Sequence, residues 1–227
     1  MKKFFYIFLF LLAAGQTNAQ LHEIGVFGGG SNFIGDVGKT NYVAPNNLTL
    51  GLLYKWNKSK RHSWRFSAMT SKVTGNDLDS DVSARRDRGY RFENRITELS
   101  AGLEFNFFDF DLHEQPFFGT PYLYTGLSYF KHENLYFDAG QLRRDGRSWN
   151  FAIPITAGVK MKISNHFVLG LETGARYTFV DDIDGSLPKN SGLDGFKFGN
   201  TNSNDWYVFT GATLTYTFGQ NPCYCKE

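Results

Sequence analysis

Apolar and polar residues alternate along much of this chain. In the stretch from Leu48 to Trp56, every second residue is apolar or aromatic, and the residues between them include Thr49 and Lys55. A period of two places alternate side chains on opposite faces of a β-strand. The pattern therefore predicts strands that have one apolar face and one mostly polar face.

Eight segments carry this alternation, and segments of about 9 to 11 residues can cross a bilayer when they are tilted. An apolar outer face and a polar inner face are typical of a closed sheet in lipid. We therefore predict an all-β fold, an eight-stranded antiparallel transmembrane β-barrel. Its strands are expected near Leu21–Gly29, Leu48–Trp56, Trp64–Ser71, Glu98–Phe107, Tyr122–Tyr129, Trp149–Lys162, Phe167–Phe179 and Val208–Phe218.

The connections alternate between long and short, as they do in bacterial barrels with long outer loops and short periplasmic turns. The long ones are expected at Gly30–Asn46, Val73–Asn94, Lys131–Arg147 and Val180–Asn204, and the short ones include Asn57–Arg61 and Ile163–His166. This order places both termini in the periplasm and four loops at the cell surface. The remaining connection, Asp109–Gly119, is long for a periplasmic turn, and its Pro116, Phe117 and Phe118 form a candidate contact site.

The N-terminus has the features of a secretory signal. Lys2 and Lys3 precede an apolar run from Phe4 to Ala14, and Ala19 supplies a small residue before Gln20. The run is too short to span a bilayer as a helix. We expect residues 1–19 to be a signal peptide and residues 20–219 to form one barrel domain in the outer membrane. Because no cysteine lies near the predicted cut, we expect the mature chain not to be a lipoprotein.

Composition agrees with a membrane barrel and excludes one class of partner. Aromatic residues make up 17% of the chain, which suits the aromatic girdles at the two membrane interfaces. The 24 basic and 22 acidic residues nearly cancel, so no nucleic-acid partner is expected.

Several charged residues fall on the predicted inner face, and an eight-stranded barrel is about wide enough for side chains to fill. We interpret these charges as a salt-linked plug, with a proton or ion path as the alternative. They are Lys55, Arg65, Glu98, Glu104, Lys160, Lys162, Glu172 and Arg176.

An enzyme in such a barrel would need a nucleophile beside a base. The candidates are Ser128 and the His132-Glu133 pair, all near the outer end of one predicted strand. Without a matched set of acid, base and nucleophile, we expect no enzymatic activity. No metal-ligand cluster or phosphate-binding loop stands out, so no cofactor is expected.

Residues 220–227 follow the last strand as a periplasmic tail that contains Cys223 and Cys225. A bridge between two cysteines with one residue between them would close a strained ring. In an oxidising compartment, a bond to a partner's cysteine is the more favourable alternative. The two cysteines could also form the strained bridge or stay free.

Four stretches resemble a known family, and together they span nearly the whole mature chain: Gly25–Gly38, Arg88–Phe107, Pro121–Phe130 and Asn221–Cys225. The chain is similar to the PorG-type outer-membrane barrels associated with the type IX secretion apparatus. This resemblance implies a role in protein secretion and gliding motility, with no catalytic residues.

The resemblance implies a membrane anchor for a periplasmic ring, which is built by a lipoprotein of the PorK/GldK type and its partner of the PorN/GldN type. It makes the Cys-x-Cys tail, Cys223 and Cys225, the natural place for a link to the ring lipoprotein. The alternatives are a plain barrel with an adhesive or envelope-stabilising role through its outer loops and, after it, a lipid-modifying enzyme. Outer-membrane lipids are partners in each case.

Overall fold

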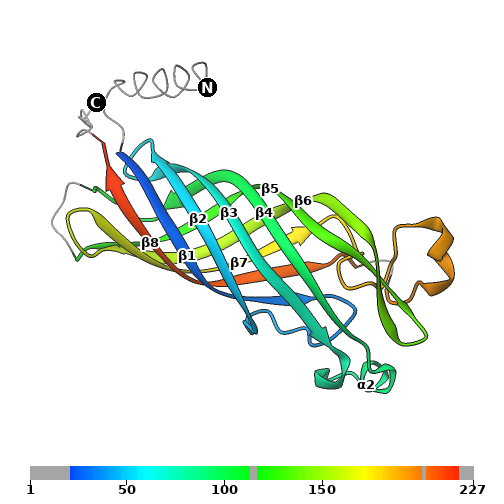
Figure 1. Ribbon diagram of the computed structural model, residues 1–227. Helices are drawn as coiled ribbons and strands as arrows, with labels where there is room; N and C mark the ends of the chain where they lie inside the picture. The colour runs from blue at the N-terminus through cyan, green and yellow to red at the C-terminus, as the bar shows by residue number, and fades with distance from the viewer. Residues whose placement is uncertain (1–20, 113–116, 201–202, 220–227) are drawn as a thin grey trace, which may run out of the picture.

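The computed structural model describes residues 21–112, 117–200 and 203–219, which form one closed antiparallel β-barrel (Figure 1). Each strand pairs with its neighbours along the chain, and β1 closes the barrel on β8. The predicted fold class is confirmed. The elements are β1 (Leu21–Ile34), β2 (Asn47–Asn57), β3 (His62–Asn76), η1 (Asp77–Asp79), α2 (Ser83–Arg88), β4 (Arg91–Asn106), β5 (Gly119–Asp138), β6 (Gln141–Lys162), β7 (Phe167–Thr178), η2 (Ser191–Phe196) and β8 (Trp206–Phe218).

The two ends of the barrel differ. At one end, here called the turn end, β1 begins and β8 finishes side by side, with His22 paired to Phe218. Residues 58–61 and 163–166 make short turns there. The other end, here called the loop end, carries residues 35–46, 77–90 and 179–205 and the β5–β6 hairpin (Figure 1). Among the described residues, no helix is long and apolar enough to cross a membrane.

The strand faces follow the predicted alternation. Large apolar residues such as Leu52, Leu99 and Leu171 are more than half exposed, whereas the charged residues between them are buried. Val208 is an exception, since it shares the outward register of Leu214 and Tyr216 on β8 but is 3% exposed. An apolar exterior around a polar interior is the arrangement of a transmembrane β-barrel.

The strands at the loop end are longer than predicted. The prediction of a long loop at Lys131–Arg147 is wrong. β5 continues to Asp138 and β6 begins at Gln141, so only a tight turn joins them. Ala139 and Gly140 both have positive φ angles, 48° and 78°, as a two-residue hairpin turn requires. Strand residues also occupy parts of the loops expected at Gly30–Asn46 and Val73–Asn94.

The physical reason for this difference is that the polarity of the two faces reverses along each long strand. On β4, Leu99 points outward and Glu98 inward, whereas nearer the loop end Arg95 is exposed and Ile96 is buried. The strand pairing continues through this reversal. The segment beyond the reversal is a barrel with an apolar core and a polar exterior, and it does not carry the lipid-facing pattern.

That core fills the loop end of the lumen. Buried aromatic and aliphatic side chains converge there from the strands and from the 179–205 connection, and aromatic pairs such as Phe33 and Phe92 pack edge to face, with ring centres 4.8 Å apart. Its main members are Phe33, Val37, Val73, Phe92, Ile96, Phe130, Leu135, Phe137, Ile183, Tyr207 and Phe209.

We predict that a charge on the outward face impairs insertion and folding. Leu103→Arg and Leu171→Arg should each cost about 2 to 4 kcal/mol, as measured for Arg near a bilayer midplane. Thr213→Ser is the control, since Thr213 is buried in the lumen and the serine that replaces it retains the hydroxyl group. Urea titration of folding into liposomes measures the effect, and equal stability of all three variants would mean that the faces are reversed.

Candidate functional site

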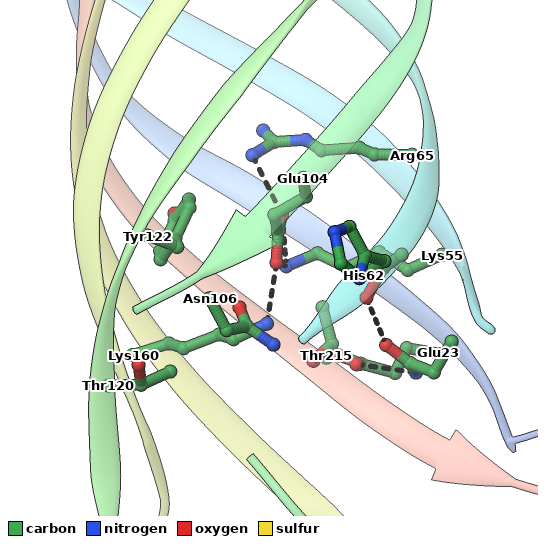
Figure 2. A network of polar contacts seen from close by, with 12 residues as sticks. Glu23, Lys55, His62, Arg65, Glu104, Asn106, Thr120, Tyr122, Lys160 and Thr215 are labelled. Carbon is green, nitrogen blue, oxygen red and sulfur yellow. Dashed lines mark hydrogen bonds and ion pairs between the residues drawn. The ribbon is translucent and has the colours of Figure 1, made fainter. Parts of the chain in front are cut away.

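The centre of the lumen is organised around Glu104 of β4 (Figure 2). Lys55 and Lys160 each donate to its Oε1, at 2.9 and 2.6 Å, and the Arg65 guanidinium lies 3.6 Å from Oε2. All four side chains are at most 3% exposed. Because buried charges are stable only when they are paired and hydrogen-bonded, this cluster meets the requirement of a closed interior.

A second carboxylate extends the network. Arg65 donates both terminal nitrogens to Glu172 at 2.7 Å each, in the bidentate geometry that makes arginine–carboxylate pairs strong. The Tyr122 hydroxyl donates to the same carboxylate. The Arg65 guanidinium also stacks on the Tyr124 ring, 4.8 Å from its centre. These contacts join β3, β5 and β7 across the lumen.

A third group lies nearer the loop end. Arg176 of β7 is 3.3 Å from the Glu98 carboxylate, and Tyr207 donates its hydroxyl to that carboxylate at 2.6 Å. The guanidinium also stacks on Phe209, 4.3 Å from the ring centre. The charges that the sequence placed on the inner face are thus buried, and those of the Glu104, Glu172 and Glu98 groups form the predicted salt-linked plug.

The turn end of the lumen is also closed. Residues 107–112 fold back over it, where Phe110 and Leu112 pack against Val168 and Phe118 in a small apolar cluster. The Lys162 ammonium group donates a hydrogen bond to the Leu112 carbonyl oxygen at 2.7 Å. Side chains therefore fill the barrel in three layers: this cluster, the ion-paired network and the apolar core of the loop end.

The candidate contact residues at this end fall in different places. Phe118 is half-buried in the apolar cluster, whereas Phe117 is 77% exposed and has a positive φ of 72°. Pro116 and the two tail cysteines, Cys223 and Cys225, lie outside the described residues, as does the signal segment 1–19.

At the loop end, carboxylates fasten the 179–205 connection into the barrel mouth. Asp184 is fully buried and accepts from the backbone N–H of Asp36 and Val37, at 2.9 and 3.0 Å. Asp205 accepts from the N–H of Ile183 at 2.9 Å. Sequence reasoning missed these residues, because an aspartate in a long connection has no periodic neighbour that would indicate burial.

This crowding of acids changes their protonation. Burial raises the pKa of Asp184 and, well above its usual value, that of Asp205. Burial, with Asp184 and Asp36 nearby, raises the pKa of Asp181 to about 8. Asp181 is therefore largely neutral at pH 7, which lowers the repulsion between these carboxyl groups.

The structure does not join Ser128 to His132. The Ser128 hydroxyl is buried without a hydrogen-bond partner among the described residues. The His132 ring instead contacts Asn150 at 2.8 Å and Asp182 at 3.4 Å, which places it in a link to the 179–205 connection. No nucleophile–base pair forms from these two candidates. The described part of the chain also has no group of His, Cys, Asp or Glu side chains arranged to hold a metal ion.

We predict that Glu104→Gln destabilises the barrel by about 3 to 5 kcal/mol, because it leaves buried cations uncompensated. Glu93→Gln is the matched control, since Glu93 pairs with Lys72 at 2.7 Å but is half exposed. A surface pair of this kind contributes only about 0 to 1 kcal/mol. Urea unfolding in detergent micelles compares the two variants, and an equal loss would contradict a structural role for the Glu104 cluster.

We predict that the loop end loosens as pH rises. The raised pKa of Asp181 favours the folded state below the ordinary aspartate pKa, and this stability is lost as pH rises through about 8. Hydrogen exchange of residues 180–187, corrected for the intrinsic rate, should show less protection at pH 9 than at pH 5. Asp181→Asn should reduce the difference, and protection independent of pH would contradict the prediction.

Solved outer-membrane proteins are similar over most of this chain: the attachment invasion locus protein Ail of Yersinia pestis (10% identity, TM-score 0.48, 88% of this chain and 100% of that chain) and the N-terminal β-barrel domain of Pseudomonas aeruginosa OprF (13% identity, TM-score 0.45, 89% and 100%). No curated protein matches the sequence. One family profile matches residues 2–227, and the chain belongs to that family, described as a domain of unknown function (DUF6089).

Proposed function

We propose that this protein is a non-enzymatic outer-membrane barrel of the type IX secretion apparatus, which anchors a periplasmic ring to the membrane. In this proposal the turn end and the tail face the periplasm, and the loop end faces the cell surface. The ring consists of a lipoprotein of the PorK/GldK type and its PorN/GldN-type partner.

The observation that carries the proposal is the filled lumen. Residues at its three levels, Phe110, Glu104 and Phe33, are each at most 4% exposed, so the described residues fill the barrel interior and leave no conduit among them. A barrel that does not conduct acts through its ends or its outer wall. An anchor requires only that one end presents a rigid surface to its partner.

The turn end has such a surface. Residues 107–112 are held by ion pairs to the β2–β3 turn, Arg61 with Asp109 at 2.5 Å and Lys60 with Asp111 at 2.9 Å. Beside this segment the Phe117 ring is largely exposed, and aromatic rings on rigid supports are typical anchors of protein interfaces. We assign Phe117, with its neighbours Pro116 and Phe118, to contact with the ring.

The tail follows β8, which finishes at Phe218 at this same end of the barrel, beside the start of β1. Cys223 and Cys225 follow within a few residues. A disulfide from one of them to the ring lipoprotein would make later contacts local, which raises the effective concentration of the partner.

An adhesive barrel is the second candidate, and the loop end supports it. Tyr42 is 80% exposed there, and Val43, Leu78 and Val82 are each more than half exposed. Apolar side chains displayed on a rigid surface can bind another protein or a cell surface.

We predict that the protein migrates in a higher-mass band on non-reducing gels of native envelopes, and that reduction collapses this band. Cys223→Ser with Cys225→Ser should remove the band and lower secretion by about tenfold or more, since tethering raises avidity by about 10² to 10⁴. Mass spectrometry of the band identifies the partner, and we expect the ring lipoprotein.

The control is barrel assembly, measured by the heat-modifiable mobility of the folded protein, which the double variant should retain. Phe117→Ala in the native-cysteine chain tests the non-covalent contact separately. Normal secretion by the double variant, with a monomeric native band in the absence of reductant, would rule out the tether. Retained secretion together with loss of surface adhesion in a Tyr42→Ala variant would favour the second candidate.

A further inference from the structure

A row of cations lies on the outward wall just beyond the apolar belt, toward the loop end. We call Lys72 of β3, Arg95 of β4, and Lys131 of β5, with Arg144 and Arg147 of β6, the basic row. On β4 the outward positions change from Leu99 through Thr97 to Arg95, so the row begins where the apolar belt stops. On β5, Lys131 follows the exposed Tyr129 in the same way.

Two members of the basic row oppose each other directly. Lys72 and Arg95 are register partners on β3 and β4, and like charges in opposed positions destabilise a sheet. Within the described residues, Arg95 and Lys131 have no ion pair with a carboxylate; Lys131 instead lies over the Trp149 ring, 5.5 Å from its centre. A bound anion would offset the repulsion.

Two carboxylates accompany the row without neutralising it. Glu93 pairs with Lys72 at 2.7 Å, and Glu133 lies 3.1 Å from Arg144 and 3.6 Å from Arg147. Five cations against two anions leave an excess positive charge at the membrane boundary.

An apolar groove on β1 to β5 lies on the turn-end side of the basic row. Its volume is about 580 Å³, which is within the usual range of ligand sites. The small side chains of Ala68 and Ala101 form its floor between the larger Leu52, Leu99, Leu127 and Tyr129. A second groove of about 440 Å³ shares Leu52 and Ala68 and continues to Thr70. The two grooves meet at these shared residues and form one furrow.

The spacing joins these two features. Ala68 and Lys72 are four residues apart on β3, as are Leu99 and Arg95 on β4, which corresponds to roughly 13 Å along a strand. A lipid with its acyl chains in the furrow would therefore place its headgroup among the cations. A furrow made of two grooves, with several cations at its loop-end side, fits a lipid with several chains and more than one negative charge.

We propose that the basic row and the furrow together form a binding site for a phosphorylated, multi-acyl glycolipid of the outer leaflet. Its phosphates would accept from Lys72, Arg95 and Lys131, and its acyl chains would lie over Ala68 and Ala101. The orientation rests on the proposed function, in which the loop end faces the cell surface. The site itself is independent of any secretion partner.

We predict that the purified full-length protein, in phosphatidylcholine nanodiscs, retains bisphosphorylated hexa-acyl lipid A in preference to its monophosphorylated form and to phosphatidylglycerol. Native mass spectrometry measures the retained lipid. Arg95→Gln with Lys131→Gln should lower retention by about thirtyfold, since each cation near an anionic lipid contributes roughly a factor of five. Ala101→Phe should lower retention by filling the furrow while the cations remain.

Two matched controls accompany these variants. Lys189→Gln removes an exposed cation outside the row, and Ala157→Phe enlarges an exposed residue outside the furrow; both should retain lipid A as the unaltered protein does. Displacement by millimolar inorganic phosphate, with no effect of Ala101→Phe, would reduce the site to a simple anion patch and overturn the proposal. Equal retention of phosphatidylglycerol and lipid A by all variants would also overturn it. Neither readout depends on secretion, so failure here is separate from failure of the ring anchor.

Discussion

The ion cluster around Glu104 is the interaction on which the rest of the barrel depends. One carboxylate lies within 3.6 Å of three cations that come from β2, β3 and β6. In a lumen surrounded by lipid, an unpaired charge costs several kcal/mol, so each of these groups requires the others. The cluster therefore ties β2 and β6 to β4, which pairs with neither of them in the sheet. A shift of these strands along the barrel axis would separate the charges.

Two apolar layers, one at the turn end and one at the loop end, enclose this ion cluster. Phe110 and Leu112 exclude water from the turn end, and the aromatic core does so at the loop end. A low dielectric strengthens the ion pairs between these layers but makes every missing partner costly. The same filling that stabilises the barrel leaves its ends and outer wall as the surfaces available for binding. Both proposals, ring anchoring at the turn end and glycolipid binding on the wall, are consistent with this restriction.

The outward face could be predicted because lipid imposes a simple rule on every second residue, as at Leu99 and Leu103 of β4. The strand lengths could not be predicted, because the polarity of the two strand faces reverses where a strand leaves the bilayer. Arg95 and Ile96 continue the alternation with opposite polarity, so the hydrophobic pattern alone made this part look like a loop. The buried acids, such as Asp184, were missed because their partners are backbone N–H groups far along the chain.

The sequence by itself determined the number of lipid-facing strands, the face that each presents and the inward direction of the charges, because these properties depend on a local period of two. Only the tertiary structure decided which charges meet. Lys55 and Glu104 are separated by 49 positions in the chain, and Arg65 and Glu172 by 107. It also decided that the lumen is closed at both ends and that Ala68 and Ala101 form one furrow below the basic row. Such contacts depend on strand register and barrel closure, which bring distant residues to one height.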